Sequence, residues 1–164
     1  MAPTIQSNYV DVYVLRRARP DAFEFLQLRR TAQRLHGTWQ TVMGRIEQGE
    51  TATDAAWREL GEETGLVRAA CLGAWSLDGV HPFFIAERDT VYLMPRFAIE
   101  APIDWRPMLN DEHDAHRWVT LAEVGSHFMW PSQLAAIREI TESLLRPGSL
   151  SEPHLRLKSP RDTD

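Results

Sequence analysis

One segment of this chain, GRIEQGETATDAAWRELGEETGL at residues 44–66, joins a glycine-containing loop to a helix rich in glutamate. Thr51 is followed three residues later by Asp54, which is a capping arrangement for the start of a helix. Gly65 supplies the left-handed residue with which helices commonly end. The segment therefore predicts a helix from about Ala52 to Thr64, both of whose ends are specified by the sequence.

The direction of the glutamates on this helix separates two interpretations of them. At about 100° per residue, Glu59 and Glu63 lie roughly 40° apart. The three alanines of the helix lie within about 60° of Glu59: Ala52, Ala55 and Ala56. A solvated row of glutamates would instead lie opposite these small apolar residues. We therefore expect the carboxylates to share the face that another backbone can approach closely, and to converge on the loop at residues 44–50.

Converging carboxylates predict a site for a hard cation. Their oxygens suit Mg²⁺, or Mn²⁺, and the segment offers no cysteine or paired histidine that would favour zinc. A cation held in this way can neutralise and orient a diphosphate, and it can lower the pKa of a bound water. Arg58, adjacent to the cluster, is expected to orient the glutamates by ion pairing.

The composition is that of an ordinary globular domain. The chain has 164 residues, of which 43% are hydrophobic and 25% are charged. We expect one domain at residues 1–147, followed by a polar tail at residues 148–164. The formal charge of −5 disfavours nucleic acid and anionic membranes as partners. An anionic substrate therefore needs a cation or local arginines.

The compartment follows from two further observations. Cys71 is the one cysteine, which excludes an internal disulfide and fits a reducing compartment. The N-terminus has no secretory pattern, and no apolar run approaches the length of a membrane span. We expect a cytoplasmic protein, and the oligomeric state is left open, a homodimer included.

The remaining pattern predicts strands on both sides of this helix and a second helix. Five runs have strand character: residues 9–15, 23–28, 38–42, 91–99 and 117–119. Pro95 inside the fourth run indicates a sheet edge or a bulge. Residues 131–145 repeat apolar side chains at nearly the helical period, start with a proline and are followed by Pro147 and Gly148. The class is α/β with a mixed sheet.

The segment at residues 44–66 resembles the signature box of the Nudix hydrolases. That box is a glycine, five residues, a glutamate, seven residues, then arginine, glutamate, an apolar residue, any residue, two glutamates, any residue, glycine and an apolar residue. No fixed position of this segment departs from it. The resemblance implies the family's α/β/α sandwich around a mixed sheet. It also implies Mg²⁺-dependent hydrolysis of a nucleoside diphosphate that is linked to another group.

The resemblance assigns roles to the glutamates of the box. Glu59 and Glu63 match the principal metal ligands of the family. Glu62 matches a third carboxylate that often joins them, and it is also a candidate to take the proton of the attacking water.

A second motif, EHDAHRW at residues 112–118, is similar to a family segment in which a glutamate precedes histidine and a later arginine and tryptophan. It implies that Glu112 is a distal metal ligand or the general base. The alternative is a solvated acidic loop, in which Asp111 and Asp114 are equivalent to Glu112.

The order of motifs further resembles the nucleoside triphosphate pyrophosphohydrolase branch, which includes bacterial dihydroneopterin triphosphate pyrophosphohydrolases. The supporting pieces are LQLRR at 26–30, TWQTVMG at 38–44, EHDAHRW at 112–118 and WPSQLAAI at 130–137. In this interpretation Arg29 or Arg30 contacts phosphate, and Trp39 and Met43 line the pocket for a nucleobase or pterin. The alternatives are an arginine that faces solvent and a tryptophan that packs in the core.

The expected function is hydrolysis of a small nucleotide-like triphosphate (NTP, dNTP or dihydroneopterin triphosphate) to a monophosphate and pyrophosphate with Mg²⁺. Pro82 lies near the position where ADP-ribose pyrophosphatases of the family carry a marker proline, so ADP-ribose or a dinucleoside polyphosphate is the alternative. A nucleotide-binding regulator without catalysis is a remote alternative, because such proteins usually have degenerate boxes.

Overall fold

This computed structural model describes residues 2–158 of the chain. Strand β2 (Tyr9–Arg17) lies at the centre of the fold. Its buried side chains alternate between two hydrophobic cores. Val10, Val12 and Val14 belong to one core, and Tyr13 and Leu15 belong to the other. A strand that is covered on both faces needs apolar residues on both, which explains the nearly continuous apolar run.

Five strands form the main path of a mixed sheet, in the order β10–β3–β2–β9–β6. β9 is parallel to β2, and the other neighbours in this path are antiparallel. Two short strands, β4 and β5, pair with β3 and β2 beside this path. The bounds of the additional strands are β3 (Phe23–Arg30), β4 (Trp39–Gln40), β5 (Val42–Arg45), β6 (Gly73–Ser76), β9 (Arg96–Glu100) and β10 (His113–Thr120).

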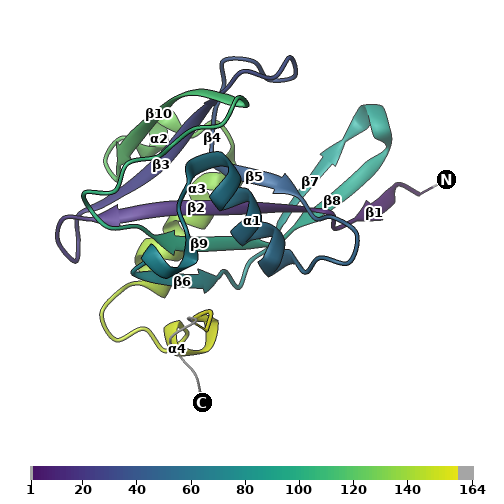
Figure 1. The fold of residues 1–164 in the computed structure, drawn as a ribbon. Coiled ribbons are helices and arrows are strands. Elements are labelled where there is room, and N and C mark those ends of the chain that lie inside the picture. The colour runs from purple at the N-terminus through teal and green to yellow at the C-terminus, as the bar shows by residue number, and fades with distance from the viewer. Residues whose placement is uncertain (1, 159–164) are drawn as a thin grey trace.

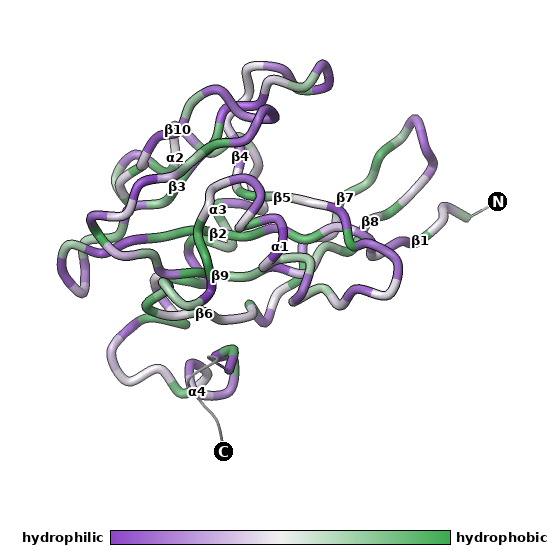
Figure 2. The backbone as a smooth tube through the Cα atoms, in the orientation of Figure 1, coloured by the Kyte–Doolittle hydropathy of each residue, from purple (hydrophilic) through white to green (hydrophobic). Residues whose placement is uncertain are grey.

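Helices cover both faces of this sheet, as Figure 1 shows. Helix α1 (Ala52–Thr64) packs on β5 and β2 over the first core. Helix α3 (Pro131–Arg138) and its π-helical continuation η3 (Glu139–Leu144) cover the second core. In Figure 2 the hydrophobic colour gathers on the central strands and the hydrophilic colour on the loops. The predicted α/β/α sandwich is confirmed.

A smaller sheet projects from the main body next to β5 (Figure 1). Its order is β1–β8–β7, with bounds β1 (Thr4–Gln6), β7 (His81–Ile85) and β8 (Thr90–Met94). The single strand predicted at residues 91–99 is wrong, because Pro95 divides it between the two sheets. Proline has no N–H for a ladder, and its carbonyl instead accepts from the Asp11 N–H at 3.1 Å.

The other predicted elements are present with altered bounds. The run at 38–42 is interrupted at Thr41, whose hydroxyl donates to the buried Asp11 carboxylate. The helix predicted at 131–145 extends to residue 144, but its last part is π-helical. Short helical turns complete the fold: η1 (Arg68–Ala70), η2 (Ala86–Arg88), α2 (Val124–His127) and α4 (Glu152–Leu155).

The described part of the predicted tail lies along β6. The Trp75 indole N–H donates to Glu152 at 2.7 Å, and the Leu157 N–H donates to the Ala74 carbonyl at 2.8 Å. Residues 159–164 of that tail lie outside the described residues, and the division after residue 147 stays a prediction. No helix among residues 2–158 is long and apolar enough to cross a membrane.

Candidate active site

The helix that carries the glutamates begins and ends as its sequence predicts. The Thr51 hydroxyl oxygen accepts from the Asp54 N–H at 3.1 Å, which caps the first turn. Gly65 has a left-handed φ of 72°, and its N–H donates to the Gly61 carbonyl. The expected bounds, Ala52–Thr64, are confirmed.

The glutamates lie on the alanine face of α1, not opposite it. Glu63 is 3% exposed and is buried together with Ala55 and Ala56. The side chain of Glu62, by contrast, is 56% exposed. A Cβ atom at Gly44 would lie 1.7 Å from Cδ of Glu59, so the absence of a side chain at Gly44 lets β5 approach this carboxylate.

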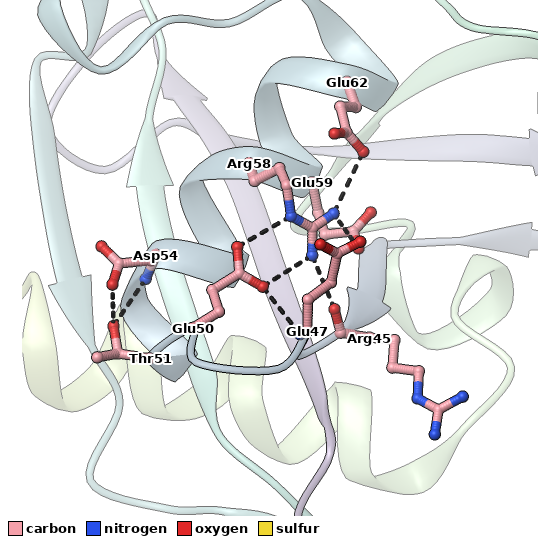
Figure 3. Close-up of polar contacts among 8 residues, drawn as sticks. All are labelled: Arg45, Glu47, Glu50, Thr51, Asp54, Arg58, Glu59 and Glu62. Atoms are coloured by element: carbon pink, nitrogen blue, oxygen red, sulfur yellow. Dashed lines mark hydrogen bonds and ion pairs between the residues drawn. The ribbon is translucent and has the colours of Figure 1, made fainter.

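Arg58 joins the loop before the helix to the glutamates on it (Figure 3). Its Nε and Nη2 donate to the two Glu50 carboxylate oxygens at 2.9 and 3.0 Å. Its Nη1 donates to Glu59 at 2.8 Å and to Glu62 at 3.2 Å, and Nη2 also donates to the Arg45 carbonyl. The guanidinium thus contacts three carboxylates, and the hydrogen bonds from it lower the pKa of Glu50.

Glu50 is a member of this arrangement that the sequence analysis left without a role. Its position did indicate a role, because Glu50 is the first of the fixed glutamates of the box. Its two contacts with Arg58 are the bidentate pair that fixes a guanidinium most firmly. Glu50 therefore holds Arg58 in the orientation from which it reaches the helix.

Glu63 is a buried carboxyl group with incomplete hydrogen bonding. It accepts from the Met43 backbone N–H, but its Oε2 is buried without a hydrogen-bond partner among the described residues. Burial raises its pKa to about 9, with further contributions from the charges of Glu59 and Glu112. Burial also raises the pKa of Glu59, despite the hydrogen bond from Arg58. The charges of Arg58 and Arg30 lower these two pKa values but do not offset the burial and the neighbouring carboxylates.

Glu112 lies close enough to this cluster to act on it, because its charge raises the pKa of both Glu59 and Glu63. It is exposed and directly precedes β10. The next residue, His113, is buried, with Nε2 3.9 Å from Oε2 of Glu63. No sequence pattern places His113 beside the cluster.

These residues fit a hard divalent cation. The donors are carboxylate oxygens, the buried Oε2 of Glu63 has no hydrogen-bond partner within residues 2–158, and neighbouring carboxylates raise the pKa values of Glu59 and Glu63. A cation would satisfy all three conditions. Within residues 2–158, however, no three His, Cys, Asp or Glu side chains form a metal-holding group as they stand. Glu59 and Glu62 are instead turned to Arg58. The assignment of Glu59, Glu62, Glu63 and Glu112 as ligands stays a prediction.

The two candidate phosphate arginines lie on opposite faces of β3, because side chains alternate along a strand. Arg30 lies on the side of the glutamates, where its charge lowers the pKa of Glu63, and its buried Nε has no hydrogen-bond partner in the described part of the chain. Arg29 forms an ion pair with Asp114 at 2.7 Å. The structure thus brings Arg30, and not Arg29, to the cluster.

Trp39 and Met43, the two candidate pocket residues, lie on the short strands β4 and β5, whose side chains also alternate between the two faces of the sheet. Trp39 pairs with Arg29 across β4 and β3, and the Arg117 guanidinium lies 4.2 Å from its ring centroid. Met43 is half-buried and lies opposite Asp11 in the pairing of β5 with β2. A separate cavity of about 550 Å³, between α3 and the turn before β3, is lined by none of the predicted site residues.

Comparisons with known proteins bear on the family and the fold of this chain. A model of the NUDIX domain matches residues 7–140. The chain is 39% identical over 112 residues to an octanoyltransferase of Myxococcus xanthus, a match that covers 67% of this chain and 30% of that protein. It is 32% identical over 98 residues to an RNA pyrophosphohydrolase of Psychromonas ingrahamii, covering 51% of this chain and 54% of that protein.

The fold has close counterparts among solved structures. The dihydroneopterin triphosphate pyrophosphohydrolase of E. coli superposes with a TM-score of 0.69 at 22% identity, covering 87% of this chain and 98% of that one. At this identity the likeness concerns the fold alone. The chain spans from under a third to about half of the length of the two sequence relatives.

Proposed function

This chain belongs to the NUDIX family, and from that premise we propose that it is a divalent-cation-dependent pyrophosphohydrolase. Its substrate in this proposal is a nucleotide-like triphosphate (NTP, dNTP or dihydroneopterin triphosphate), which it cleaves to a monophosphate and pyrophosphate. The observation that carries the proposal is the pair of carboxyl groups of Glu59 and Glu63, whose pKa values are raised by burial and by neighbouring carboxylates. Glu59 lies directly beside Gly44. The relative from Psychromonas ingrahamii, which is named for pyrophosphate release, supports the same reaction class.

The four glutamates have distinct positions for this chemistry. Glu59 and Glu63, joined by Glu62 and Glu112, would hold Mg²⁺ or Mn²⁺. When bound, the cation would neutralise the polyphosphate and make a water molecule more acidic. Arg58 keeps the box glutamates in place through its contacts with Glu59 and Glu62.

The reaction itself needs a nucleophile, a base and stabilisation of the leaving group. A water oxygen attacks phosphorus, the bridging P–O bond breaks, and pyrophosphate leaves. Glu112 is exposed beside the buried glutamates and can accept the proton of that water, with Glu62 as the other candidate. Arg30, which has a buried nitrogen without a partner, is the candidate for a phosphate oxygen. Trp39 and Met43 stay the candidates to line the pocket for the nucleobase or pterin of the substrate.

A substrate panel with product identification tests the proposal. NTPs, dNTPs, dihydroneopterin triphosphate, ADP-ribose, dinucleoside polyphosphates and a 5′-triphosphorylated oligonucleotide are incubated with Mg²⁺. We expect pyrophosphate from a small triphosphate. Glu63→Gln should keep the fold and lower turnover at least about 100-fold, whereas Glu87→Gln, at an exposed glutamate of η2, should not. An unchanged rate for Glu63→Gln in Mg²⁺ would refute the assignment.

The same panel separates the alternatives. ADP-ribose would yield two monophosphates and no pyrophosphate. Pro82, which first suggested that substrate, lies in strand β7, so it does not mark a turn. Hydrolysis of the oligonucleotide alone would revise the expectation that nucleic acid is not a partner. Nucleotide binding without phosphate release would identify a regulator. The cytoplasmic location and a homodimer stay predictions.

A further inference from the structure

The loop that carries Glu112 is held by its backbone. The Glu112 carbonyl accepts from the Thr31 N–H at 2.9 Å, and the Asp111 carbonyl accepts from the Thr31 hydroxyl at 2.8 Å. Thr31 directly follows β3. The central sheet therefore fixes one side of this loop, although none of the hydrogen bonds found among residues 2–158 involves the Glu112 carboxylate itself.

Asn110 holds the other side of the loop. Its Oδ1 accepts from the Glu112 N–H at 3.2 Å and lies 3.3 Å from Nδ1 of His113. An asparagine whose side chain binds the backbone two residues later forms an Asx-turn, which orders a loop without a strand ladder. The His113 N–H also donates to the Asn110 carbonyl at 3.2 Å. One residue thus holds the backbone of Glu112 and the ring of His113.

Both of these side chains meet the glutamates of α1. The Glu112 charge acts on Glu59 and Glu63, and the His113 ring lies 3.9 Å from the carboxylate oxygen of Glu63 that has no partner. An exposed glutamate on a loop explores many rotamers, and ordering it for a reaction costs free energy. Catalytic groups need placement to about 0.5 Å. A fixed backbone at residues 110–113 removes the backbone contribution to that cost and leaves the side-chain rotamers of Glu112 to be ordered.

We propose that Asn110 is a positioning residue, which orients the Glu112 carboxylate and the His113 ring toward Glu63. The proposal rests on the proposed function, because it requires Glu112 to take part in the reaction. Asn110 itself contacts neither substrate nor reacting atoms. Its effect on turnover should therefore act through Glu112, because Glu112 is the one of these two side chains to which the proposed reaction gives a role.

Three variants test the role of the Asn110 acceptor. Asn110→Ala removes Oδ1 and should lower kcat at least tenfold while KM changes less than threefold. Asn110→Asp keeps an oxygen that can accept both contacts and should retain kcat within about threefold. Arg106→Ala is the matched control, since Arg106 is exposed on the same loop and no hydrogen bond of its side chain is found among residues 2–158.

A second readout does not depend on turnover. In the metal-free protein, the Glu112 amide hydrogen should exchange at least tenfold faster in Asn110→Ala, because its acceptor is gone. Exchange should be unchanged in Asn110→Asp and Arg106→Ala. Calorimetric titration with Mn²⁺ should show at least threefold weaker binding to Asn110→Ala.

A double-mutant cycle with Glu112→Gln decides whether Asn110 acts through Glu112. If it does, Asn110→Ala should cause no further loss of kcat in the Glu112→Gln background. Additive losses, or wild-type kcat in Asn110→Ala, would overturn the inference. If Asn110→Ala does not fold, Asn110→Leu, which is similar in size and has no acceptor, takes its place with the same expectations.

The outcomes also separate this inference from the proposed function. An active wild type that loses turnover in Glu63→Gln, but not in Asn110→Ala, overturns only the role of Asn110. A wild type that releases no product from any compound of the panel overturns both.

Discussion

Asp11 is an ionisable residue in the middle of an apolar strand. It is 1% exposed, accepts a hydrogen bond from the Thr41 hydroxyl and lies near the Arg96 guanidinium. Burial outweighs these favourable contacts and raises its pKa to about 6. A carboxyl group whose folded-state pKa exceeds its unfolded-state value binds protons more tightly in the folded protein.

This carboxyl group gives a prediction about stability and pH. As pH rises from about 3 to 7, the unfolded chain loses the Asp11 proton first, so the free energy of unfolding falls, by about 3 kcal/mol in total for a shift of this size. An asparagine in its place would carry no charge at any of these pH values. Asp11→Asn should therefore be more stable than the wild type at pH 7 by roughly 1–3 kcal/mol, and not at pH 4, in urea unfolding at both pH values. An equal difference at the two pH values would contradict the cause.

Gly44 gives a prediction that separates stability from activity. The three atoms nearest to an added Cβ all belong to the Glu59 side chain, with Cδ at 1.7 Å. That side chain is flexible and can turn away, so Gly44→Ala should change the free energy of unfolding by less than about 1 kcal/mol. The carboxylate would leave its place beside β5, and kcat should fall at least tenfold. Loss of stability with normal kcat would show that Glu59 has no part in the reaction.

The sequence predicted site residues where one helix determines their direction, and it missed those that depend on the packing of distant segments. The face of Glu59 and Glu63 follows from 100° per residue and is as expected. The alternation that brings Arg30 but not Arg29 to the cluster depends on the strand register. The approach of His113 to Glu63 depends on how β10 pairs with β3, which no local pattern encodes.

At the scale of elements, the sequence predicted the centres of strands better than their ends. The strand predicted at 117–119 is longer in the structure, where it spans His113–Thr120. The prediction was too short because exposed polar residues in the first half of the strand hide its alternation. The break at Pro95 was visible, but its consequence, two strands in two sheets, depends on the pairing of β8 with β1 and of β9 with β2.

Helix α1 offers two glycines with opposite expected effects on stability. Gly65 has φ 72°, and an added Cβ would lie 2.9 Å from Cε of Met108, so Gly65→Ala should cost about 1–2 kcal/mol. Gly61 is inside the helix with open space around its Cα, so Gly61→Ala should stabilise the protein by about 0.5–1 kcal/mol. Thermal unfolding of both variants checks the pair. A destabilised Gly61→Ala would contradict the assigned helix geometry.

At the scale of the whole molecule, the sandwich places the candidate cation ligands and the candidate pocket residue Trp39 on different sides of one sheet. The glutamates belong to the α1 layer, whereas Trp39 shares the opposite face of β3 and β4 with Arg29 and Arg117. The gap between β4 and β5, at Thr41, lies where β2 changes its partner from β5 to β3.

Cation binding should then stabilise the entire fold, because the unfolded chain does not keep the carboxylates together. A cation at 100 times its Kd adds about 2.7 kcal/mol to the free energy of unfolding. For a chain of this size, that is a rise in Tm of roughly 5–10 °C.

Glu63→Gln removes a ligand and also the buried, repelled carboxyl group, whose pKa is raised to about 9. We therefore expect the variant to melt higher than the wild type in EDTA, and to gain little on addition of Mg²⁺ or Mn²⁺. Differential scanning calorimetry with and without the cation measures both effects, with Glu87→Gln as the control. Equal gains in the wild type and in Glu63→Gln would place the cation elsewhere on the molecule.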